Sequence, residues 1–292
     1  MGGDANEGDD DQAVSVAALH VYPVKSCAGV NLDESLVIET GLEFDRAWMV
    51  VDAHGEFVTQ RELPRMALVR TELKTYDMVL RAPGMLALHV ALDTVEKPVR
   101  ATVWNDTVAA YDMGGLCAQW FSDFLGQPLR LVRFDPQHKR LSDRAWTGAI
   151  DAENAFTDGF PILVASTAGL DELNRRLAAL GHPAVTMARL RPNLVLDGLD
   201  AHGEDALDEI VFAADDGPVR IKLVKPCSRC PIPDVDPATG EPGHAVGDVL
   251  RSYRADARVG GSITFGMNAV IVEGIERVLR AGMEGSASFR FD

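Results

Sequence analysis

The chain has 292 residues and carries 44 acidic against 28 basic residues, which gives a formal net charge of −16 at pH 7. This balance excludes a protein whose main work is to bind nucleic-acid phosphates, because such affinity depends on clustered Lys and Arg. A length about twice that of a typical domain leaves room for two hydrophobic cores, and no apolar run approaches the roughly 18 to 20 residues of a membrane span, so no membrane partner is expected.

The first element in chain order is an acidic tail over residues 1–12. It contains five acidic residues and no basic one, which predicts a solvated, disordered segment. It lacks the basic and apolar blocks of a signal peptide and the Arg-rich composition of a transit peptide, so the expected location is cytoplasmic. The chain has only four cysteines, too few for a disulfide scaffold, and we expect reduced thiols at Cys27, Cys117, Cys227 and Cys230.

From Val14 onward the sequence is typical of β-strands. Val14–Tyr22 alternates and leads into the loop PVKSCAGV at residues 23–30. Trp48–Val51 and Glu56–Thr59 flank the turn DAHG, which predicts a hairpin. Further strands are predicted at 68–75, 78–81, 86–92, 99–104, 108–111, 161–165, 194–197, 210–213, 219–224 and 269–272. This spacing favours a barrel or sandwich over a βαβ array.

Two helices interrupt the strands. Apolar residues recur at helical spacing from Leu116 to Phe124 before Gly126, and from Leu170 to Leu177 before Gly181. Ser166 and Thr167 are candidate N-caps of the second helix. We therefore predict a mainly β, α+β protein, in which a smaller β-rich domain precedes a barrel-like core and a cleft between the two holds a ligand.

The densest group of reactive residues is KPCSRCPIPDVDPATG, residues 225–240, directly after a predicted strand. Positive charge on Lys225 and Arg229 favours the ionised forms of Cys227 and Cys230, and thiolate is the form that binds metals. The prolines at 226, 231, 233 and 237 restrict φ and make this loop stiff. Such a junction between a strand and a rigid loop is suited to hold a metal ligand in place.

The residues alone leave three other interpretations of this thiol pair open. A structural zinc site needs four ligands, and one C-x-x-C pair leaves only scattered histidines such as His244 and the distant Cys27 to complete it. A thioredoxin-like dithiol needs a helix after the pair, which the sequence Pro-Ile-Pro at 231–233 forbids. The two cysteines could also be small, partly buried hydrophobic residues without further chemistry.

A set of segments together resembles a known family. They are YPVKSC (22–27), GLEFDRAWMV (41–50), VTQRELPR (58–65), STAGLDELNRRL (166–177), RPNLVLDG (191–198) and KPCSRC (225–230) followed by VDPATG (235–240). In order and spacing they resemble the MOSC proteins that carry an N-terminal MOSC β-barrel, among them the mitochondrial amidoxime-reducing component and its bacterial relatives. The resemblance runs from about His20 to Asn268. It implies a MOSC N-terminal β-barrel domain over 13–127 and a MOSC domain over 128–292.

The resemblance also implies a molybdenum-pterin cofactor whose metal is bound by Cys230, with Cys227 in support. Matched to the family pattern, the residues that contact the cofactor are Lys25, Ser26, Arg46, Ser166, Thr167, Arg191 and Asn193. Ser166 and Thr167 would offer a helix N-terminus to its phosphate, and Arg61 would face the substrate. Relatives commonly have two threonines where this chain has Pro233 and Asp234. Asp234 is therefore a candidate catalytic proton donor beside the metal, if desolvation raises its pKa.

The activity implied by the resemblance is that of a molybdenum-dependent oxidoreductase. It would reduce N-hydroxylated compounds, such as amidoximes, hydroxylamines and N-hydroxylated nucleobases, in a detoxification role. The chain reaches Asp292 without further cysteines for a ferredoxin-like domain and without the membrane anchor of mitochondrial relatives, so a separate flavin, haem or iron–sulfur protein would deliver electrons. Pyridoxal phosphate binding is associated with the family as a whole.

Two other functions remain open at this point. One is a carrier of the molybdenum cofactor or of its sulfur, which would act through a persulfide on Cys230. The other is a binding protein without a cofactor.

Overall fold

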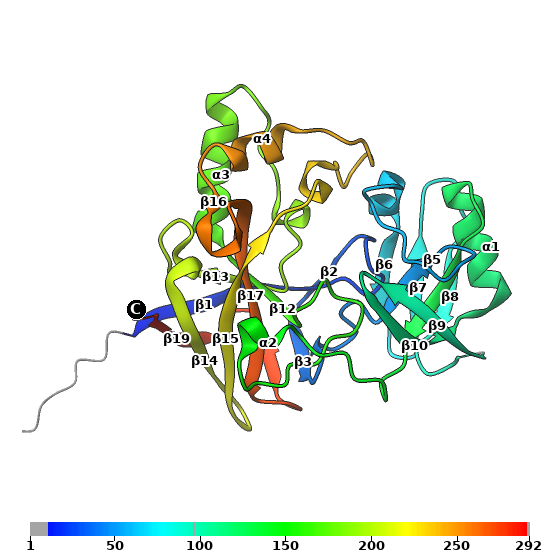
Figure 1. The fold of residues 1–292 in the computed structure, drawn as a ribbon, viewed down its shortest axis with the longest axis horizontal. Helices are drawn as coiled ribbons and strands as arrows, with labels where there is room; N and C mark the ends of the chain where they lie inside the picture. The colour runs from blue at the N-terminus through cyan, green and yellow to red at the C-terminus, as the bar shows by residue number, and fades with distance from the viewer. Residues whose placement is uncertain (1–10, 96, 291–292) are drawn as a thin grey trace, which may run out of the picture.

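The structure is a computed structural model that describes residues 11–95 and 97–290. Residues 1–10, on which most of the predicted disordered tail falls, lie outside the described residues, and Gln12 already belongs to the first strand. Figure 1 shows two β-rich parts side by side, one crossed by the longest strands and topped by two helices, the other covered by α1. This mainly β architecture confirms the predicted fold class.

The larger part is a closed barrel of seven strands. They follow one another around the barrel as β12 (Ile162–Ser166), β13 (Leu194–Asp197), β1 (Gln12–Val21), β19 (Glu284–Phe289), β14 (Leu207–Ala214), β15 (Gly217–Ser228) and β17 (Ser262–Glu273). Closure comes from β12, which pairs in parallel with β13 and antiparallel with β17. The short strand β2 (Val30–Leu32) pairs with β1, and the short strand β16 (Ala255–Asp256) pairs with β17.

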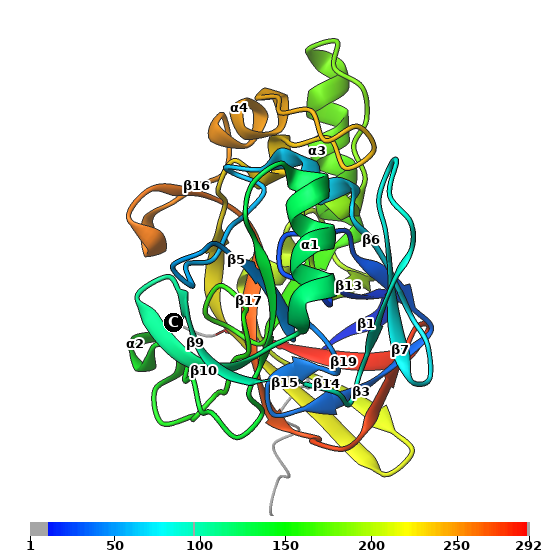
Figure 2. The same cartoon turned by 90° about the vertical axis from the view of Figure 1, so that its right-hand side faces the viewer.

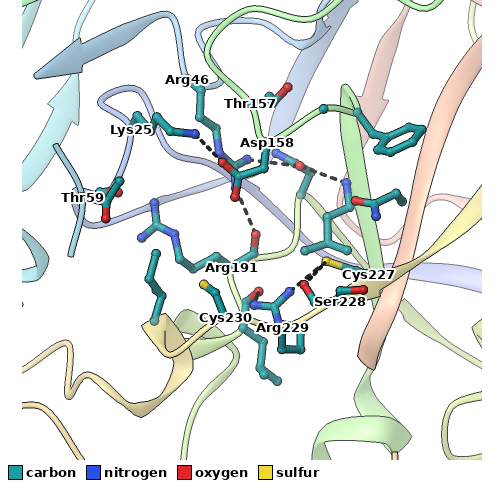
Figure 3. A pocket seen from close by; sticks show the side chains of 18 of the residues that line it. Lys25, Arg46, Thr59, Thr157, Asp158, Arg191, Cys227, Ser228, Arg229 and Cys230 are labelled. Atoms are coloured by element: carbon teal, nitrogen blue, oxygen red, sulfur yellow. Dashed lines mark hydrogen bonds and ion pairs between the residues drawn. The ribbon is translucent and has the colours of Figure 1, made fainter. Parts of the chain in front are cut away.

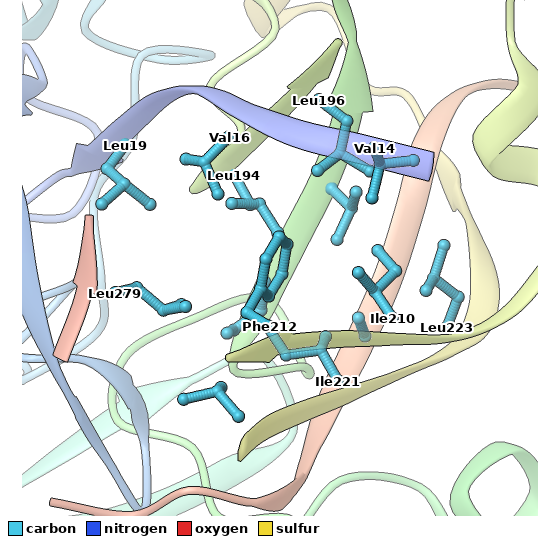
Figure 4. Packing of buried hydrophobic residues seen from close by; sticks show 14 of the residues in the cluster. Val14, Val16, Leu19, Leu194, Leu196, Ile210, Phe212, Ile221, Leu223 and Leu279 are labelled. Carbon is cyan, nitrogen blue, oxygen red and sulfur yellow. The ribbon is translucent and has the colours of Figure 1, made fainter. Parts of the chain in front are cut away.

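Alternation along the barrel strands fills the interior with aliphatic side chains around Phe212 (Figure 4). In β1, Val14, Val16 and Leu19 are buried, whereas the residues between them are partly or fully exposed. Because side chains on a strand alternate between its two faces, one face of β1 fills the barrel and the other meets solvent or neighbouring loops. Closure also removes the unpaired strand edges that an open sheet would leave.

The smaller part contains two sheets and one long helix. One sheet has the order β5 (Trp48–Val51), β11 (Arg130–Phe134), β10 (Asp106–Asp112) and β9 (Lys97–Val103). The other joins β6 (Arg70–Leu73), β7 (Asp77–Arg81) and β8 (Leu88–Ala91). Helix α1 (Gly114–Leu125) buries Trp120, Phe121 and Phe124 and ends at Gly126, whose φ of 78° is the left-handed conformation expected of a C-cap glycine.

The remaining elements connect or cover these sheets (Figures 1 and 2). A third small sheet joins β18 (Val278–Arg280), β3 (Glu34–Ile38) and β4 (Gly41–Leu42). Helix α3 (Thr167–Ala179) packs against α4 (Ala245–Arg251), and α2 (Arg144–Thr147) is a single turn. The 3₁₀ turns are η1 (Pro64–Leu68), η2 (Met187–Arg189), η3 (Gly203–Ala206), η4 (Ile232–Asp234) and η5 (Ala257–Val259). Within the described residues, no helix is both long and apolar enough to cross a bilayer.

Two predicted strands are wrong in part. The second arm of the predicted hairpin forms no strand, because Glu56 and Phe57 make only isolated bridges, to Thr102 and Val51 respectively. The segment predicted as a strand from residue 68 begins inside η1, where Pro64 fixes a helical φ at the first turn. All four cysteines are free thiols, as expected.

A buried polar cluster lies beneath the start of α3. The hydroxyl of Ser166 donates to Oε2 of Glu204 over 2.5 Å, and Oε1 of Glu204 has no partner among the described residues. Burial raises the pKa of Glu204 to about 7, and burial lowers the pKa of His202, nearby, to about 4. Glu204 is fully buried, so the folded protein holds this proton more tightly than the unfolded chain does.

We predict that Glu204→Gln stabilises the protein increasingly as the pH rises. The carboxyl group contributes its full stability below the unfolded pKa of 4.5 and loses it as the pH approaches about 7, a change of about 3 kcal/mol, whereas glutamine does not ionise. Urea unfolding of both proteins at pH 5 and pH 8 measures the effect. His202 has the opposite pH slope but is present in both proteins, so the difference between them isolates Glu204. Parallel stability profiles would contradict the prediction.

Candidate functional site

A cleft lies where the barrel meets the smaller part (Figure 3). Segments far apart in the sequence build it: the loop after β1, the residues just before and just after β5, the irregular chain before β12, the loops that follow α3 and β15, and one residue of β17. Its polar and sulfur-containing lining comprises Lys25, Ser26, Arg46, Thr59, Arg61, Thr157, Asp158, Arg191, Asn193, Cys227, Ser228, Arg229, Cys230 and Asn268.

The thiol pair stands at the end of β15. Pairing of β15 with β17 reaches Ser228, opposite Thr264, and the amide of Arg229 donates to the Ile263 carbonyl over 2.9 Å. Beyond Cys230, Pro231 leads into η4 rather than into an α-helix. The backbone on both sides of Cys230 is therefore fixed, as the prolines predicted, and the geometry lacks the helix start that a thioredoxin-like dithiol requires.

The two thiols differ in their surroundings. Sγ of Cys227 accepts a hydrogen bond of 3.2 Å from Nη1 of Arg229, whose Nη2 donates to the Leu190 carbonyl. Cys230 is half-buried at the cleft, and its Sγ makes no hydrogen bond to any described residue. Cys230 is thus the thiol that is open to a ligand, while Cys227 is tied to Arg229.

Within the described residues, the fold brings no further zinc ligands to the thiol pair. Cys27 is fully buried, and burial raises the pKa of its thiol to about 12. His244 is exposed and pairs with Asp248 on α4. Across the chain that the structure describes, no group of three His, Cys, Asp or Glu side chains is arranged to hold a metal ion. The zinc interpretation therefore has no ligand set here.

Two arginines of the cleft share one aromatic ring. The guanidinium carbons of Arg46 and Arg191 each lie 4.2 Å from the ring centroid of Tyr22, which is buried and donates to the Pro192 carbonyl. Arg46 also bonds to Asp45 over 2.5 Å and to Oδ1 of Asn193 over 3.2 Å. Cation–π contact and hydrogen bonds together fix both guanidinium groups in place.

The cleft is locally positive although the chain is strongly acidic. Its lining contains five cations, Lys25, Arg46, Arg61, Arg191 and Arg229, and a single carboxylate, that of Asp158. Burial and, to a smaller extent, the neighbouring charge of Arg46 lower the pKa of Arg191 to about 10. An anion in the cleft would relieve this repulsion, so the site is electrostatically prepared for one.

Lys25 and Asp158 form the remaining charged pair. Nζ of Lys25 donates to the Phe156 carbonyl over 2.8 Å and pairs with the Asp158 carboxylate. The charge and hydrogen bond of Lys25 hold the pKa of Asp158 well below its usual range. Asp158 is therefore ionised at neutral pH and cannot donate a proton there.

The backbone of the cleft is strained at three of its residues. Ser26, Arg46 and Arg191 have φ values of 64°, 48° and 59°, although none is a glycine. Such conformations cost of order 1–3 kcal/mol each and are concentrated at functional sites, where they direct side chains that a relaxed backbone would misplace. Three of the seven such residues in the described chain line this one cleft.

The structure brings most of the predicted site residues together. Lys25, Ser26, Arg46, Arg61, Arg191, Asn193, Cys227 and Cys230 all line the cleft. Their convergence could not be read from spacing alone, because they come from segments up to about two hundred residues apart in the chain.

Three predicted residues do not reach the cleft. Ser166 is fully buried, where it caps α3 through the Gly169 amide and bonds to Glu204, and Thr167 bonds to Asp197. The hydroxyl groups at the start of α3 are thus bonded to carboxylates of the chain itself. Asp234 instead accepts a 3.0 Å hydrogen bond from the Gly247 amide on α4. Ser166, Thr167 and Asp234 therefore lie apart from the cleft and bond to groups of the chain itself.

Two functional groups of the cleft were not predictable from the sequence: the carboxylate of Asp158 and the hydrogen bonds of Arg229. Asp158 lies in an irregular stretch, Thr157-Asp158-Gly159, with no catalytic motif, and its one local signal is an Asp-Gly pair of the kind common in turns. Arg229 was expected to act through charge alone. Its Nε is buried without a partner in the described structure, while its other nitrogens fix the loop.

Comparison with known proteins identifies the family. Residues 13–128 match the MOSC N-terminal beta barrel domain and residues 151–284 match the MOSC domain. Mitochondrial amidoxime reducing component 2 of Rattus norvegicus is 35% identical over 259 residues, which are 83% of this chain and 73% of that protein. Human mitochondrial amidoxime-reducing component 1 is 34% identical over 253 residues, with the same shares covered. Human molybdenum cofactor sulfurase is 28% identical over 270 residues, which are 86% of this chain and 29% of that protein. The chain therefore belongs to the family of MOSC proteins that carry an N-terminal MOSC β-barrel domain.

Proposed function

We propose that this protein binds a molybdenum-pterin cofactor in the cleft through Cys230 and reduces N-hydroxylated compounds. Relatives named as amidoxime-reducing components, at 34–35% identity, support the reaction class. The observation that carries the proposal is the position of Cys230, an unbonded thiol beside a cluster of fixed cations.

The residues of the cleft fit such a cofactor. A soft thiolate is a suitable ligand for a redox-active metal that is otherwise bound by the sulfurs of a pterin dithiolene. The phosphate of the cofactor needs cations, which Arg46 and Arg191 supply in fixed positions, and a polar ring edge needs donors such as the unpartnered buried Nε of Arg229. Among the described residues that line the cleft, Asp158 is the one carboxylate and is paired with Lys25, and the carboxylate of Asp45 lies behind Arg46, to which it is bonded.

Asn193 has a supporting part in this arrangement. Its Oδ1 accepts hydrogen bonds from Nη1 of Arg46 and from the Leu163 amide, and its Nδ2 donates to the His20 carbonyl. These bonds use both ends of the amide. Asn193 therefore positions Arg46 and anchors it to the barrel, and a direct contact with the cofactor is not required for its role.

When bound, the molybdenum cofactor supplies two-electron chemistry in which oxygen is removed from the substrate. The residues of the chain itself would bind the cofactor and the substrate and orient them. Cys230 would hold the metal at the cleft, Arg46 and Arg191 would fix the anionic part of the cofactor, and Arg61, which also lines the cleft, would meet the substrate. Reduction of an N–OH group to N–H consumes two electrons and two protons and releases water, and a separate electron-transfer protein carrying a flavin, haem or iron–sulfur centre would provide the electrons.

A direct assay tests the proposal. The purified full chain, loaded with molybdenum cofactor and supplied with a chemical reductant, is expected to convert an amidoxime to the amidine, and to reduce a hydroxylamine and an N-hydroxylated nucleobase. Product formation is followed by chromatography, with the cofactor-free protein as the control. A fully loaded protein that is inert toward all three substrates would refute the proposed reaction.

A second candidate function is a carrier of the cofactor or its sulfur. The unbonded thiol of Cys230 and the 28% identity to a molybdenum cofactor sulfurase favour it. Mass spectrometry of the native protein separates the two functions. Stoichiometric molybdenum and pterin support the reductase, whereas a labile extra sulfur on Cys230 without metal supports the carrier.

A further inference from the structure

Trp104 has a backbone conformation that is unfavourable for a bulky residue. It is the first residue of the two-residue turn between β9 and β10, and its φ is 56°. Glycine, asparagine and aspartate favour such positions, whereas a bulky side chain there is a conformational outlier. In addition, this large apolar residue is 42% exposed to solvent. Both features cost free energy. We therefore expect the contacts of the ring to have a function that offsets this cost.

The contacts of Trp104 converge on the cleft. The guanidinium carbon of Arg61 lies 4.6 Å from the centroid of the Trp104 ring, and Phe57 supports the ring with a centroid distance of 5.1 Å. Nε1 of Trp104 donates to Oδ1 of Asp158 over 3.1 Å, and the same carboxylate pairs with Lys25. Trp104 does not line the cleft itself, but three residues that do, Arg61, Asp158 and Lys25, depend on it or on its partner.

Arg61 differs from the other arginines of the cleft. Its guanidinium group makes no hydrogen bond or ion pair to a described residue, whereas those of Arg46, Arg191 and Arg229 each donate to oxygen or sulfur atoms. The aromatic ring therefore holds Arg61 without using its N–H donors. A planar guanidinium with free donors is suited to bind a phosphate or carboxylate with two hydrogen bonds.

We propose that Trp104 is a positioning residue that holds Arg61 at the mouth of the cleft as the binding group for an anionic part of the ligand. The ligand is either the substrate, as an N-hydroxylated compound that carries a phosphate, or the cofactor through its own phosphate. Only this choice of ligand depends on the proposed function, because the geometry of the anion site exists without it.

A double-mutant cycle on the cofactor-free full chain tests the positioning, with inorganic phosphate as the probe. Binding of phosphate is measured by calorimetry for the wild type, Arg61→Met, Trp104→Gly and the double variant. Glycine relieves the turn but removes the ring, and the loss of a cation–π contact is expected to weaken binding about three- to tenfold. In the Arg61→Met background the same change should have no further effect, because the two residues act as one unit.

Two further variants separate the effect of the Trp104 ring from other effects of the substitution. Trp104→Phe keeps a ring for Arg61 but loses the donor to Asp158, and it should bind phosphate within about twofold of the wild type if the ring is what matters. Tyr76→Ala removes an exposed aromatic ring that does not line the cleft and should leave binding unchanged. Wild-type affinity in Trp104→Gly, equal losses in both backgrounds, or an absence of phosphate binding to the wild type would each overturn the proposal.

Measurements on the cofactor-loaded enzyme distinguish whether the anion belongs to the substrate or to the cofactor. If Arg61 binds the substrate, Trp104→Gly keeps its molybdenum content and raises KM for a phosphorylated N-hydroxylated nucleoside, while KM for the neutral nucleoside and kcat stay the same. If Arg61 binds the cofactor, Trp104→Gly loses molybdenum content on dialysis. Because the phosphate experiment needs no turnover, the anion site is tested even if the proposed reaction fails.

Discussion

Replacement of Cys230 by serine is expected to abolish molybdenum retention and, with it, N-reductive activity. A serine hydroxyl is a harder ligand than a thiolate and stays protonated at neutral pH, so it cannot replace the metal–sulfur bond. The fold should be unaffected, because Cys230 is half-buried and its Sγ makes no hydrogen bond to a described residue. Elemental analysis of the purified proteins, expressed with ample molybdate, measures the loss.

Cys227→Ser is the matched control for that experiment. Sγ of Cys227 accepts a hydrogen bond from Arg229, and a serine oxygen can accept the same bond. This variant should keep most of its molybdenum and a cooperative unfolding transition close to that of the wild type. Molybdenum retained by Cys230→Ser and lost by Cys227→Ser would assign the ligand to the other thiol and contradict the account.

Replacement of Arg191 by methionine is expected to weaken retention of the cofactor at least about tenfold, because a charge-assisted hydrogen bond to a phosphate would be lost. The cofactor-free protein should be as stable as the wild type or more stable. Burial and the nearby charge of Arg46 both disfavour the Arg191 guanidinium, and the Cys27 carbonyl, the Tyr22 ring and the charge of Asp45 compensate in part. Molybdenum content after dialysis and urea unfolding of the cofactor-free form measure the two effects.

Arg189→Met provides the control for Arg191→Met. Arg189 is two residues away, does not line the cleft, and pairs with Asp236 over 3.1 Å. Its removal should leave cofactor retention unchanged. If both variants lose the cofactor equally, a general disturbance of this loop explains the loss. If Arg191→Met destabilises the cofactor-free protein strongly, Arg191 serves the fold, and its proposed role in binding an anion is wrong.

The periodic parts of the sequence predicted the fold well. Helix α3 and strand β13 begin and end within two residues of their predicted limits, because an apolar stripe and a capping serine define the helix and a run of four residues defines the strand. Strand β19 was not predicted. Its sequence EGSASF is weakly apolar, and Gly285 lies so close to Phe212 that only a residue without a side chain fits, a requirement visible only in three dimensions.

The conformation of the site could be predicted from the sequence where a local motif determines it. It could not be predicted where tertiary contacts determine it. The prolines around Cys230 correctly indicated a fixed loop, whereas the helix start at Ser166 met the rule for an anion site and yet holds the chain's own Glu204. Local spacing cannot reveal that a carboxylate thirty-eight residues later folds onto the same place. The left-handed backbone of Arg46 and Arg191 likewise depends on the assembled cleft.

The most direct test of the central claim is a crystal structure of the cofactor-loaded protein with diffraction data recorded at the molybdenum absorption edge. One strong anomalous peak is expected within bonding distance of Sγ of Cys230, with the phosphate of the cofactor beside Arg46 and Arg191. A peak bonded to Cys227, or a fully loaded crystal whose molybdenum lies outside this cleft, would contradict it.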